Sequence, residues 1–393
     1  MTLYDPRSLR TKLSEKNCTF LGVGPMSLNC VNAVIELAYD YPAPLMLIAS
    51  RRQIDCVEFG GGYVNNWDTF AFARYVRDHD PEGRILLARD HGGPWQHPQE
   101  VELCANIKDA MASAKRSYFN DIQAGFDILH IDPVFIYGQE TPSLEWVVDK
   151  VLELFSFCME TAQVLGKEVY VELGTEEQQQ SPLSDLSSIK YLIERVNSFC
   201  QKNKYELPIY IVIQTGTKVM GTDNIGYFPK CSEEVDEYIA KHKLDEAICI
   251  CNSNGILIKE HNADYLSDHS LAFHRKIGIN AANVAPEFGV VETKALFEVM
   301  DELGLIDLKA EFIDIALQSK KWEKWLVPGV QYSNLEKATI CGHYVFSHER
   351  ICEIKESLRI CYQSKNMESC LDRHLMLRVK KAIFRYMINF GMI

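Results

Sequence analysis

The sequence lacks the features that mark membrane and secreted proteins. No apolar run approaches the roughly 18 to 20 residues of a membrane helix, and Met1–Lys16 is polar and charged, unlike a signal peptide. The 13 cysteines show no C-x-x-C spacing and no disulfide framework. Cys249 and Cys251 fall in an apolar run, where we expect buried, reduced thiols. We therefore expect a cytoplasmic protein with no membrane partner.

Signatures of nucleotide and nucleic-acid proteins are also missing. The net charge of -13 argues against nucleic acid as a partner, because phosphate backbones favour clustered Lys and Arg. The segment Gly22–Pro25 lacks the third glycine of a dinucleotide-binding loop, and the chain has neither a P-loop nor a G-x-S-x-G turn. An anionic small substrate remains compatible, since a pocket can be basic in an acidic protein.

The sequence does contain short β-rich runs that alternate with amphipathic helical patterns. This alternation favours a closed (β/α)8 TIM barrel of the α/β class over an open doubly wound sheet. The eight predicted strands are Cys18–Val23, Pro44–Ser50, Ile85–Asp90, Ile128–Asp132, Glu168–Leu173, Pro208–Gln214, Gly255–Glu260 and Lys276–Asn283.

The helical pattern continues alone after the last predicted strand. Helices are expected at Thr293–Leu303, Lys309–Gln318, Ser347–Cys361 and His374–Phe390. We therefore predict a barrel over residues 1–295 and a helical C-terminal extension over residues 296–393. The extension is expected to pack on the barrel or on a neighbouring subunit of a homo-oligomer.

Polar side chains gather at the C-terminal ends of the predicted strands. Any one of them could simply begin a loop, but the whole set predicts an active-site mouth. Two histidines and a glutamate from different strands fit one divalent cation, zinc first, which would stabilise an enediolate next to a ketone. The set comprises Arg51, Arg52, Gln53, Asp90, His91, His130, Asp132, Glu172, Glu176, Gln214, His261, Asp264, Asn280 and Asn283.

Asp90 and His91 follow the apolar run Ile85–Ala88 directly and precede a glycine pair. Alone, such a pair is more often a capping Asp beside a surface His. At the end of a barrel strand it suits an acid/base next to a metal ligand, and this context favours the functional interpretation.

A further set of segments, spread in collinear order over most of the chain, forms a recognisable pattern: Phe59–Tyr63, Arg84–Gln96, Ala124–Asp132, Gly174–Glu176, Val212–Gly216, Asn224–Ile225, Glu260–Tyr265, Ile277–Asn280 and His343–Phe346. In these segments the chain resembles the accessory, so-called non-catalytic, subunit family of class II D-tagatose-1,6-bisphosphate aldolase. That family is in turn similar to class II aldolases and ketose-6-phosphate 4-epimerases.

The resemblance implies roles for individual residues. Asp90 would be the proton-transfer carboxylate, His91 and His261 would be metal ligands, and Glu172 would lie at the metal. We add Glu176 as a second catalytic group. The expected substrate-binding residues are Arg51, Gln53, Asp132, Gln214 and Asn280.

The chain also departs from the pattern of these relatives. Asn262–Asp264 replaces the glycine-rich phosphate loop of the catalytic aldolases, and Gln214 or Asp223 stands where a further histidine ligand is expected. Arg51 and Arg52 follow the second strand, where the accessory family has a carboxylate. These arginines either hold an anionic group of the substrate or face solvent.

Two functions follow as hypotheses. The first is a divalent-metal enzyme, with zinc as cofactor, that acts on a tagatose- or fructose-type ketose or ketose phosphate by retro-aldol chemistry, either C4 epimerisation or aldol cleavage. The alternative is an accessory subunit that stabilises or activates a separate class II aldolase catalytic subunit.

Overall fold

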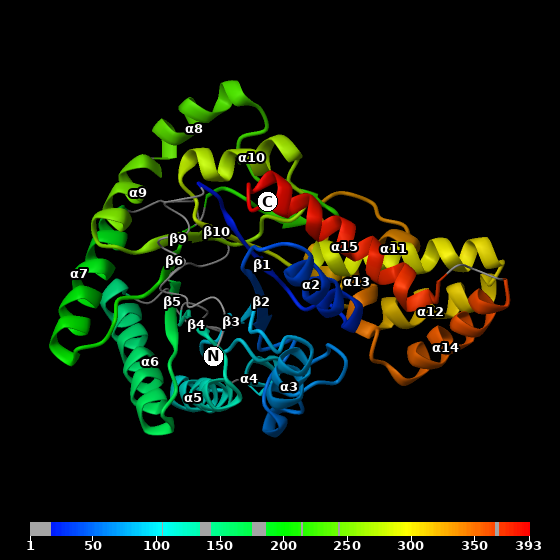
Figure 1. Cartoon of the computed structure of the whole chain (residues 1–393), viewed down its shortest axis with the longest axis horizontal. Coiled ribbons are helices and arrows are strands. Elements are labelled where there is room, and N and C mark those ends of the chain that lie inside the picture. Colours follow the sequence, from blue (N-terminus) through cyan, green and yellow to red (C-terminus); the bar gives the residue numbers. More distant parts are fainter. Residues whose placement is uncertain are drawn as a thin grey trace.

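Eight parallel strands close into a barrel, which confirms the predicted (β/α)8 fold (Figure 1). The computed structural model describes residues 17–103, 105–133, 143–174, 186–213, 215–242, 244–365 and 369–393. The barrel strands are β1 (Phe20–Val23), β2 (Leu45–Ser50), β3 (Ile85–Asp90), β4 (Ile128–Ile131), β5 (Tyr170–Gly174), β6 (Tyr210–Val212), β9 (Leu257–Glu260) and β10 (Ala281–Val284).

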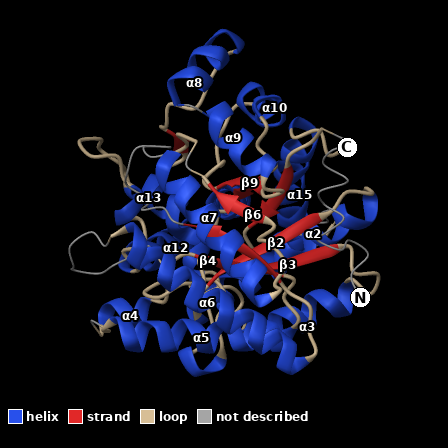
Figure 2. Ribbon diagram, turned by 90° about the vertical axis from the view of Figure 1, so that its left-hand side faces the viewer, coloured by secondary structure: helices blue, strands red, loops and turns tan. Residues whose placement is uncertain are grey.

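Helices enclose the strands on all sides (Figure 2). Polar residues fix several helix starts: Ser27, Asp68 and Asn106 each accept a backbone N–H of the first turn. The helices of the barrel are α2 (Leu28–Asp40), α3 (Thr69–His79), α4 (Pro98–Glu102), α5 (Ile107–Ala124), α6 (Leu144–Leu165), α7 (Leu186–Asn203), α8 (Val235–His242), α9 (Leu244–Ser253), α10 (Asp268–Ile277) and α11 (Pro286–Leu303).

Two local expectations were wrong. The eighth strand begins at Ala281 and not at Lys276, because α10 continues through Lys276 and ends at Gly278, which adopts a left-handed conformation with φ 85°. Cys249 and Cys251 both lie on α9, and only Cys251 is buried. Residues two apart on a helix point to nearly opposite sides, so an apolar run does not bury both.

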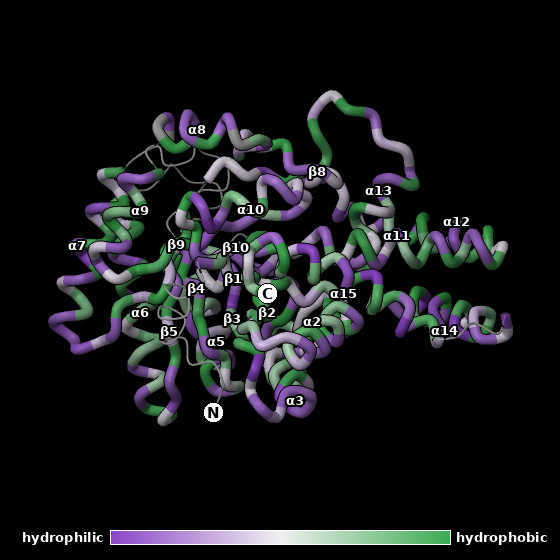
Figure 3. The backbone as a smooth tube through the Cα atoms, turned by 45° about the horizontal axis from the view of Figure 1, so that its top comes forward, coloured by the Kyte–Doolittle hydropathy of each residue, from purple (hydrophilic) through white to green (hydrophobic). Residues whose placement is uncertain are grey.

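The C-terminal helices form a second apolar cluster beside the barrel. They are α12 (Ile306–Gln318), α13 (Asn334–Cys341), α14 (Glu349–Ser364) and α15 (Leu371–Asn389), and α12 and α14 project to one side (Figure 3). α11 runs through residue 295, and α15 packs back on the barrel, where Val379 and Ile383 join the main core. The division after residue 295 stays a prediction.

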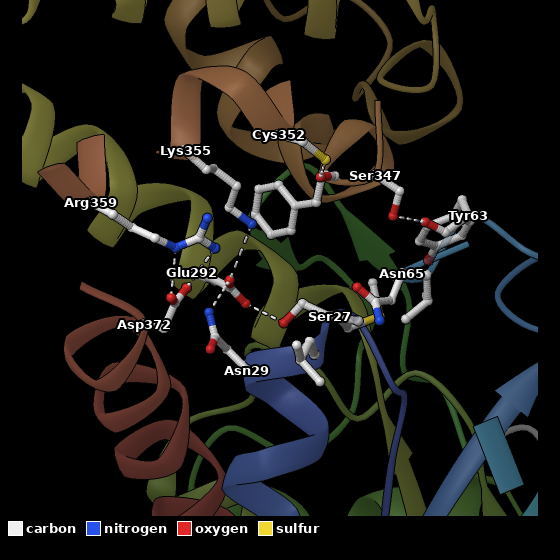
Figure 4. A pocket seen from close by; sticks show the side chains of 14 residues that line it. Ser27, Asn29, Tyr63, Asn65, Glu292, Ser347, Cys352, Lys355, Arg359 and Asp372 are labelled. Carbon is white, nitrogen blue, oxygen red and sulfur yellow. Dashed lines mark hydrogen bonds and ion pairs between the residues drawn. The ribbon is translucent and has the colours of Figure 1, made fainter. Parts of the chain in front are cut away.

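A pocket lies where these helices meet the barrel (Figure 4). At its base the Glu292 carboxylate, on α11, is fully buried and accepts hydrogen bonds from the Ser27 hydroxyl and from Asn29 Nδ2, the latter at 2.9 Å. Lys355 Nζ, on α14, lies 3.9 Å from Glu292 Oε1 and 4.0 Å from the centroid of the Phe346 ring. Glu292 therefore joins the barrel to the extension.

None of the helices formed by the described residues combines the length and the apolar character that crossing a membrane requires.

Candidate metal centre

The end of β3 is shaped so that Asp90 and His91 face the barrel mouth. His91 has a left-handed backbone with φ 46°, and the chain then turns tightly through Gly92 and Gly93. A Cβ atom on Gly92 would lie 2.5 Å from the Tyr118 ring, and one on Gly93 would lie 2.3 Å from the carbonyl oxygen of Asp132. Only glycines permit this turn, which explains the sequence after the Asp-His pair.

Three imidazoles converge at this end of the barrel. His91 follows β3, His130 lies on β4 and His261 follows β9, and one ring nitrogen from each lies within 4.8 Å of the others. The ring centroids of His91 and His261 are 5.0 Å apart, as are those of His130 and His261. Tetrahedral zinc with bonds of about 2.1 Å sets its nitrogen ligands about 3.4 Å apart, so small side-chain shifts suffice for one shared cation.

The Asp90 carboxylate lies among these rings. Its Oδ1 atom is 3.8 Å from His130 Nδ1 and 3.7 Å from His261 Nε2, and its Oδ2 atom is 4.0 Å from His91 Nε2. Asn283, at the end of β10, donates from Nδ2 to Asp90 Oδ1 at 3.2 Å and fixes its orientation. One carboxylate and three imidazoles thus lie close enough together to contact the same bound ion or substrate.

Asp132 holds His91 in place. Its Oδ2 atom lies 2.7 Å from His91 Nδ1 and accepts a hydrogen bond from Gln96 Nε2 at 3.0 Å, while Oδ1 accepts the Gly93 N–H at 2.9 Å. This bond leaves His91 Nε2 free to face Asp90. A carboxylate behind a histidine ligand is a common arrangement in metal sites.

Glu172, on β5, lies beside the imidazoles as the register partner of His130 on β4. Lys259 Nζ donates to its Oε2 atom at 2.6 Å, and its Oε1 atom is 3.4 Å from His261 Nε2. Burial favours protonation of Glu172, but Lys259 and His261 outweigh it and hold the pKa well below its usual range. Glu172 therefore forms an ion pair with Lys259 beside the cluster, and its expected role at the metal stays a prediction.

The surroundings of Asp90, His130 and His91 shift the pKa values of these three groups in different directions. Burial alone would raise the pKa of Asp90, but His91, His261, His130 and Lys259 hold it below its usual range. Burial lowers the pKa of His130 to about 4, so this imidazole is neutral at pH 7. Burial also opposes protonation of His91, but Asp90 and the bond to Asp132 outweigh it and raise the pKa to about 9. At pH 7 the centre thus combines an ionised Asp90, a protonated His91 and a neutral His130, and a cation at His91 would have to displace its proton.

Several expected substrate-binding residues have other roles. The Arg51 guanidinium is fully buried, 2.9 Å from Asp55 and 2.6 Å from Glu100, so it supports the loop and cannot reach substrate. Gln53 bonds to the Ser50 N–H at 2.8 Å and to the Met26 sulfur at 3.1 Å. Asp132 is engaged with His91, as described above.

Asn280 is at the wrong end of the barrel for substrate binding. It precedes the first residue of β10, and its Oδ1 atom accepts the Ile258 N–H at 2.8 Å. The late start of the strand moves Asn283 to the mouth instead. Glu176 and Gln214 lie outside the described residues, so their roles stay predictions.

His130 and Asn283 belong to the set predicted for the active-site mouth but received no role of their own, and Lys259 was not in that set. Strand periodicity carries a signal for two of them, because alternate residues of a strand point to the same face. His130 and Asp132 share one face of β4, and Lys259 and His261 share one face of β9. Following this period from His261 and Asp132 would have identified both residues.

One further observation bears on whether the three histidines could hold a divalent metal ion. His130 Nε2 is buried and has no hydrogen-bond partner among the described residues, which is unusual for a structural imidazole. The other ring nitrogen, Nδ1, lies 3.8 Å from Asp90 Oδ1 and accepts the N–H of His91 at 3.2 Å, so an ion bound at Nδ1 would displace this hydrogen bond. His91, His130 and His261 are the residues that would hold the ion.

Comparisons with known proteins bear on the fold. No protein-family model matches the chain, and no curated protein matches it in sequence. Among solved structures, a probable tagatose 6 phosphate kinase from Sinorhizobium meliloti 1021 is similar over 95% of this chain and 100% of that chain, with a TM-score of 0.72 and 16% identity. The YdjI aldolase from Escherichia coli K12 covers 90% of this chain and 96% of its own, with a TM-score of 0.49 and 13% identity. At 16% identity, the likeness to the first of these two structures shows a shared fold.

The loop behind His261 gives a prediction about pH. Asp264 is buried, and its Oδ1 atom accepts the N–H groups of Ala285 and Glu287 at 3.0 and 2.9 Å. Burial and the nearby Glu287 raise the pKa of Asp264 to about 8. An unfolded Asp titrates near pH 4 (about 3.9). The contribution of Asp264 to stability is therefore fully present below about pH 4 and is lost as the pH rises towards about 8.

We expect Asp264→Asn to weaken this pH dependence, because the amide oxygen still accepts both N–H groups and carries no charge. The free energy of unfolding, measured by urea denaturation at pH 5, 6.5 and 8, should improve relative to wild type as the pH rises. Asp268→Asn, at an exposed site, is the control. A constant difference between variant and wild type across this range would contradict the assignment.

Proposed function

We propose that the protein is a divalent-metal enzyme that acts on a ketose or ketose phosphate by retro-aldol chemistry, either C4 epimerisation or aldol cleavage. The observation that supports it most is the convergence of His91, His130 and His261 around the Asp90 carboxylate at the barrel mouth. Zinc is the ion we favour for three imidazole ligands. A bound cation would withdraw electron density from the substrate carbonyl and its neighbouring hydroxyl.

The chain's own groups would move the proton. Asp90 takes the proton of the C4 hydroxyl, the C3–C4 bond breaks, and its electron pair passes to the C2 carbonyl, which leaves an enediolate and an aldehyde. For epimerisation the aldehyde turns its other face, the bond forms again, and Asp90 returns the proton to the new C4 oxygen. For cleavage the aldehyde leaves, the proton held by Asp90 passes to C3 of the enediolate, and the resulting ketone leaves. Asn283 holds Asp90 in position for both steps.

The proposal is tested by incubating purified protein with neutral ketoses and ketose phosphates, before and after chelation and after zinc is restored. We expect a change at C4 or release of an aldehyde that needs the metal. If no ketose reacts, but the protein raises the activity of a separate class II aldolase, the accessory role replaces the enzyme. Sizing of the same sample tests the predicted homo-oligomer.

The ligand set makes a separate prediction. His130→Ala should lower zinc affinity by at least about 100-fold, because removal of even an outer partner of a metal ligand typically costs 10- to 100-fold. Equilibrium dialysis against a chromophoric chelator measures this. His269→Ala, at an exposed histidine on α10, should bind zinc as the wild type does. If Glu172→Gln loses zinc while His130→Ala binds it normally, the three-histidine site is wrong and the ligands are His91, Glu172 and His261, as expected from the sequence.

A further inference from the structure

A positively charged side chain lies beside the metal centre. Ser50 and Asp90 are register partners on neighbouring strands, so Arg52, two residues after Ser50, begins its loop beside His91 and Gly92. Unlike buried Arg51, Arg52 is exposed, and its guanidinium forms no ion pair with any described residue. The backbone carbonyl of Arg52 accepts the N–H of Tyr63 at 3.2 Å, which places the Tyr63 ring next to it.

A second cation comes from the C-terminal extension. Lys324 lies in η3 (Glu323–Trp325), in the segment between α12 and α13 that reaches back towards the barrel loops (Figure 3). The carbonyl oxygen of Trp325 accepts the N–H of Gly221, in the turn of the hairpin β7 (Val219–Met220) and β8 (Asp223–Asn224), at 2.6 Å. That hairpin is fixed in turn, because Asn224 donates to the carbonyl oxygens of Asn262 and Asp264, each at 2.9 Å, just after His261.

Aromatic rings connect the two cations. Lys324 Nζ lies 4.6 Å from the Trp325 ring centroid and 5.6 Å from that of Tyr344, and the Tyr344 and Tyr63 rings are 4.8 Å apart. Lys324 belongs to the exposed residues, yet desolvation of its ammonium over these rings and the charge of Arg52 lower its pKa to about 7. Neither cation has an ion-pair partner among the described residues, although the chain carries a net charge of -13.

A buried histidine adds hydrogen-bonding capacity to the same surface. The His343 ring lies 4.2 Å from the Tyr344 ring and 6.3 Å from the Tyr63 ring. It is buried, and neither ring nitrogen has a hydrogen-bond partner among the described residues. It packs against Gly289 in the first turns of α11, where a Cβ atom would lie 2.5 Å from His343 Cγ. An uncharged donor and acceptor therefore lies behind the aromatic rings.

We propose that Arg52 and Lys324 bind the anionic group of an acidic sugar substrate, a phosphate ester or a carboxylate, and that the C-terminal extension thereby completes the active site. The inference rests on the proposed function, which takes the histidine cluster as the reacting end of the sugar. The partly buried rings of Tyr63 and Tyr344 would line the path between the two ends. This surface takes the place of the glycine-rich phosphate loop that the chain lacks after His261.

The test compares ligands that differ only at the far end of the sugar. Calorimetric titration of the zinc-loaded protein with a neutral ketohexose, its 6-phosphate and the corresponding six-carbon keto acid gives three dissociation constants. We expect one or both anions to bind at least about tenfold more tightly than the neutral sugar, since charge-assisted bonds are the strong ones. Comparing the dissociation constants of the 6-phosphate and the keto acid decides whether the group bound is a phosphate ester or a carboxylate.

Lys324→Met and Arg52→Met should each remove most of this preference and leave binding of the neutral sugar unchanged. Lys337→Met is the matched control, because Lys337 also lies on the extension with its ammonium over a ring, 4.7 Å from the Trp322 centroid. Equal affinity for neutral and anionic sugars, or an unchanged preference in Lys324→Met, would overturn the proposal. If a variant fails to fold, Lys324→Gln and the loss of wild-type preference at high salt answer the same question.

The binding assay separates this inference from the proposed function. An anion preference that depends on Lys324, without turnover of any sugar, would retain the subsite and reject the enzyme. Turnover of neutral ketoses without an anion preference would retain the enzyme and reject the subsite.

Discussion

Asp90→Asn should lower turnover of the ketose substrate by about 10² to 10⁴-fold, the usual contribution of a general acid/base. The amide has nearly the shape of the carboxylate but cannot take the C4 hydroxyl proton. Because the three imidazoles and Asp132 are unchanged, zinc content and melting temperature should stay close to those of the wild type. Turnover, metal content and thermal unfolding of one preparation measure all three.

Asp132→Asn is the informative comparison for this prediction. Asp132 acts on His91 through a 2.7 Å contact, so its loss should weaken zinc binding about 10- to 100-fold, and added zinc should restore part of the turnover. Added zinc should not rescue Asp90→Asn. If Asp90→Asn instead turns over normally and loses only about 1 kcal/mol of stability, Asp90 is a structural cap.

Glu292→Ala should lower the free energy of unfolding by about 3 kcal/mol, the low end of the range for breaking a buried charge pair. Glu292 is fully buried, and its removal leaves Ser27, Asn29 and Lys355 without their shared acceptor (Figure 4). Because these groups come from the barrel and from the extension, the loss should loosen their junction. Urea denaturation followed by tryptophan fluorescence measures the change.

Glu298→Ala on the same helix controls for the loss of one carboxylate. Glu298 is about half exposed, and its oxygen lies 2.8 Å from Arg378 Nη1 at the surface. Surface pairs of this kind contribute about 0 to 1 kcal/mol. Similar losses in both variants would show that the buried network does not hold the junction together.

The barrel could be predicted because its strands are short apolar runs separated by amphipathic helices, a pattern that depends on local sequence. Ile85–Asp90 matches β3 exactly in its bounds. The eighth strand was placed too early, because Ile277 and Ile279 are buried on either side of a helix end and look like part of a strand. Because of this error, substrate binding was assigned to Asn280, whereas Asn283 is the residue that lies at the barrel mouth.

The site could be predicted only where local sequence determines position. Asp90 and His91 follow an unambiguous strand, and they lie where the sequence analysis placed them. Arg51 and Arg52 are neighbours in the sequence, but Arg51 is buried and Arg52 is exposed. Glu100, which forms an ion pair with the buried Arg51, is 49 residues further along the chain. Contacts between such distant residues depend on the packing of whole elements. The same holds for Lys324, in a segment with no strand pattern, because its neighbour Trp325 contacts Gly221, about a hundred residues earlier in the chain.

The packing of α15 on β1 has a consequence for the order in which the protein assembles. The N–H of Thr19, just before β1, donates to the carbonyl oxygen of Phe390 at 2.9 Å, and Tyr386 is fully buried in the barrel core. Because α15 is synthesised after all eight strands, the core of the barrel can be completed only once residues 371–392 have left the ribosome. Until then the apolar surface that α15 covers has no partner, and we expect this to be the stage at which chaperones matter.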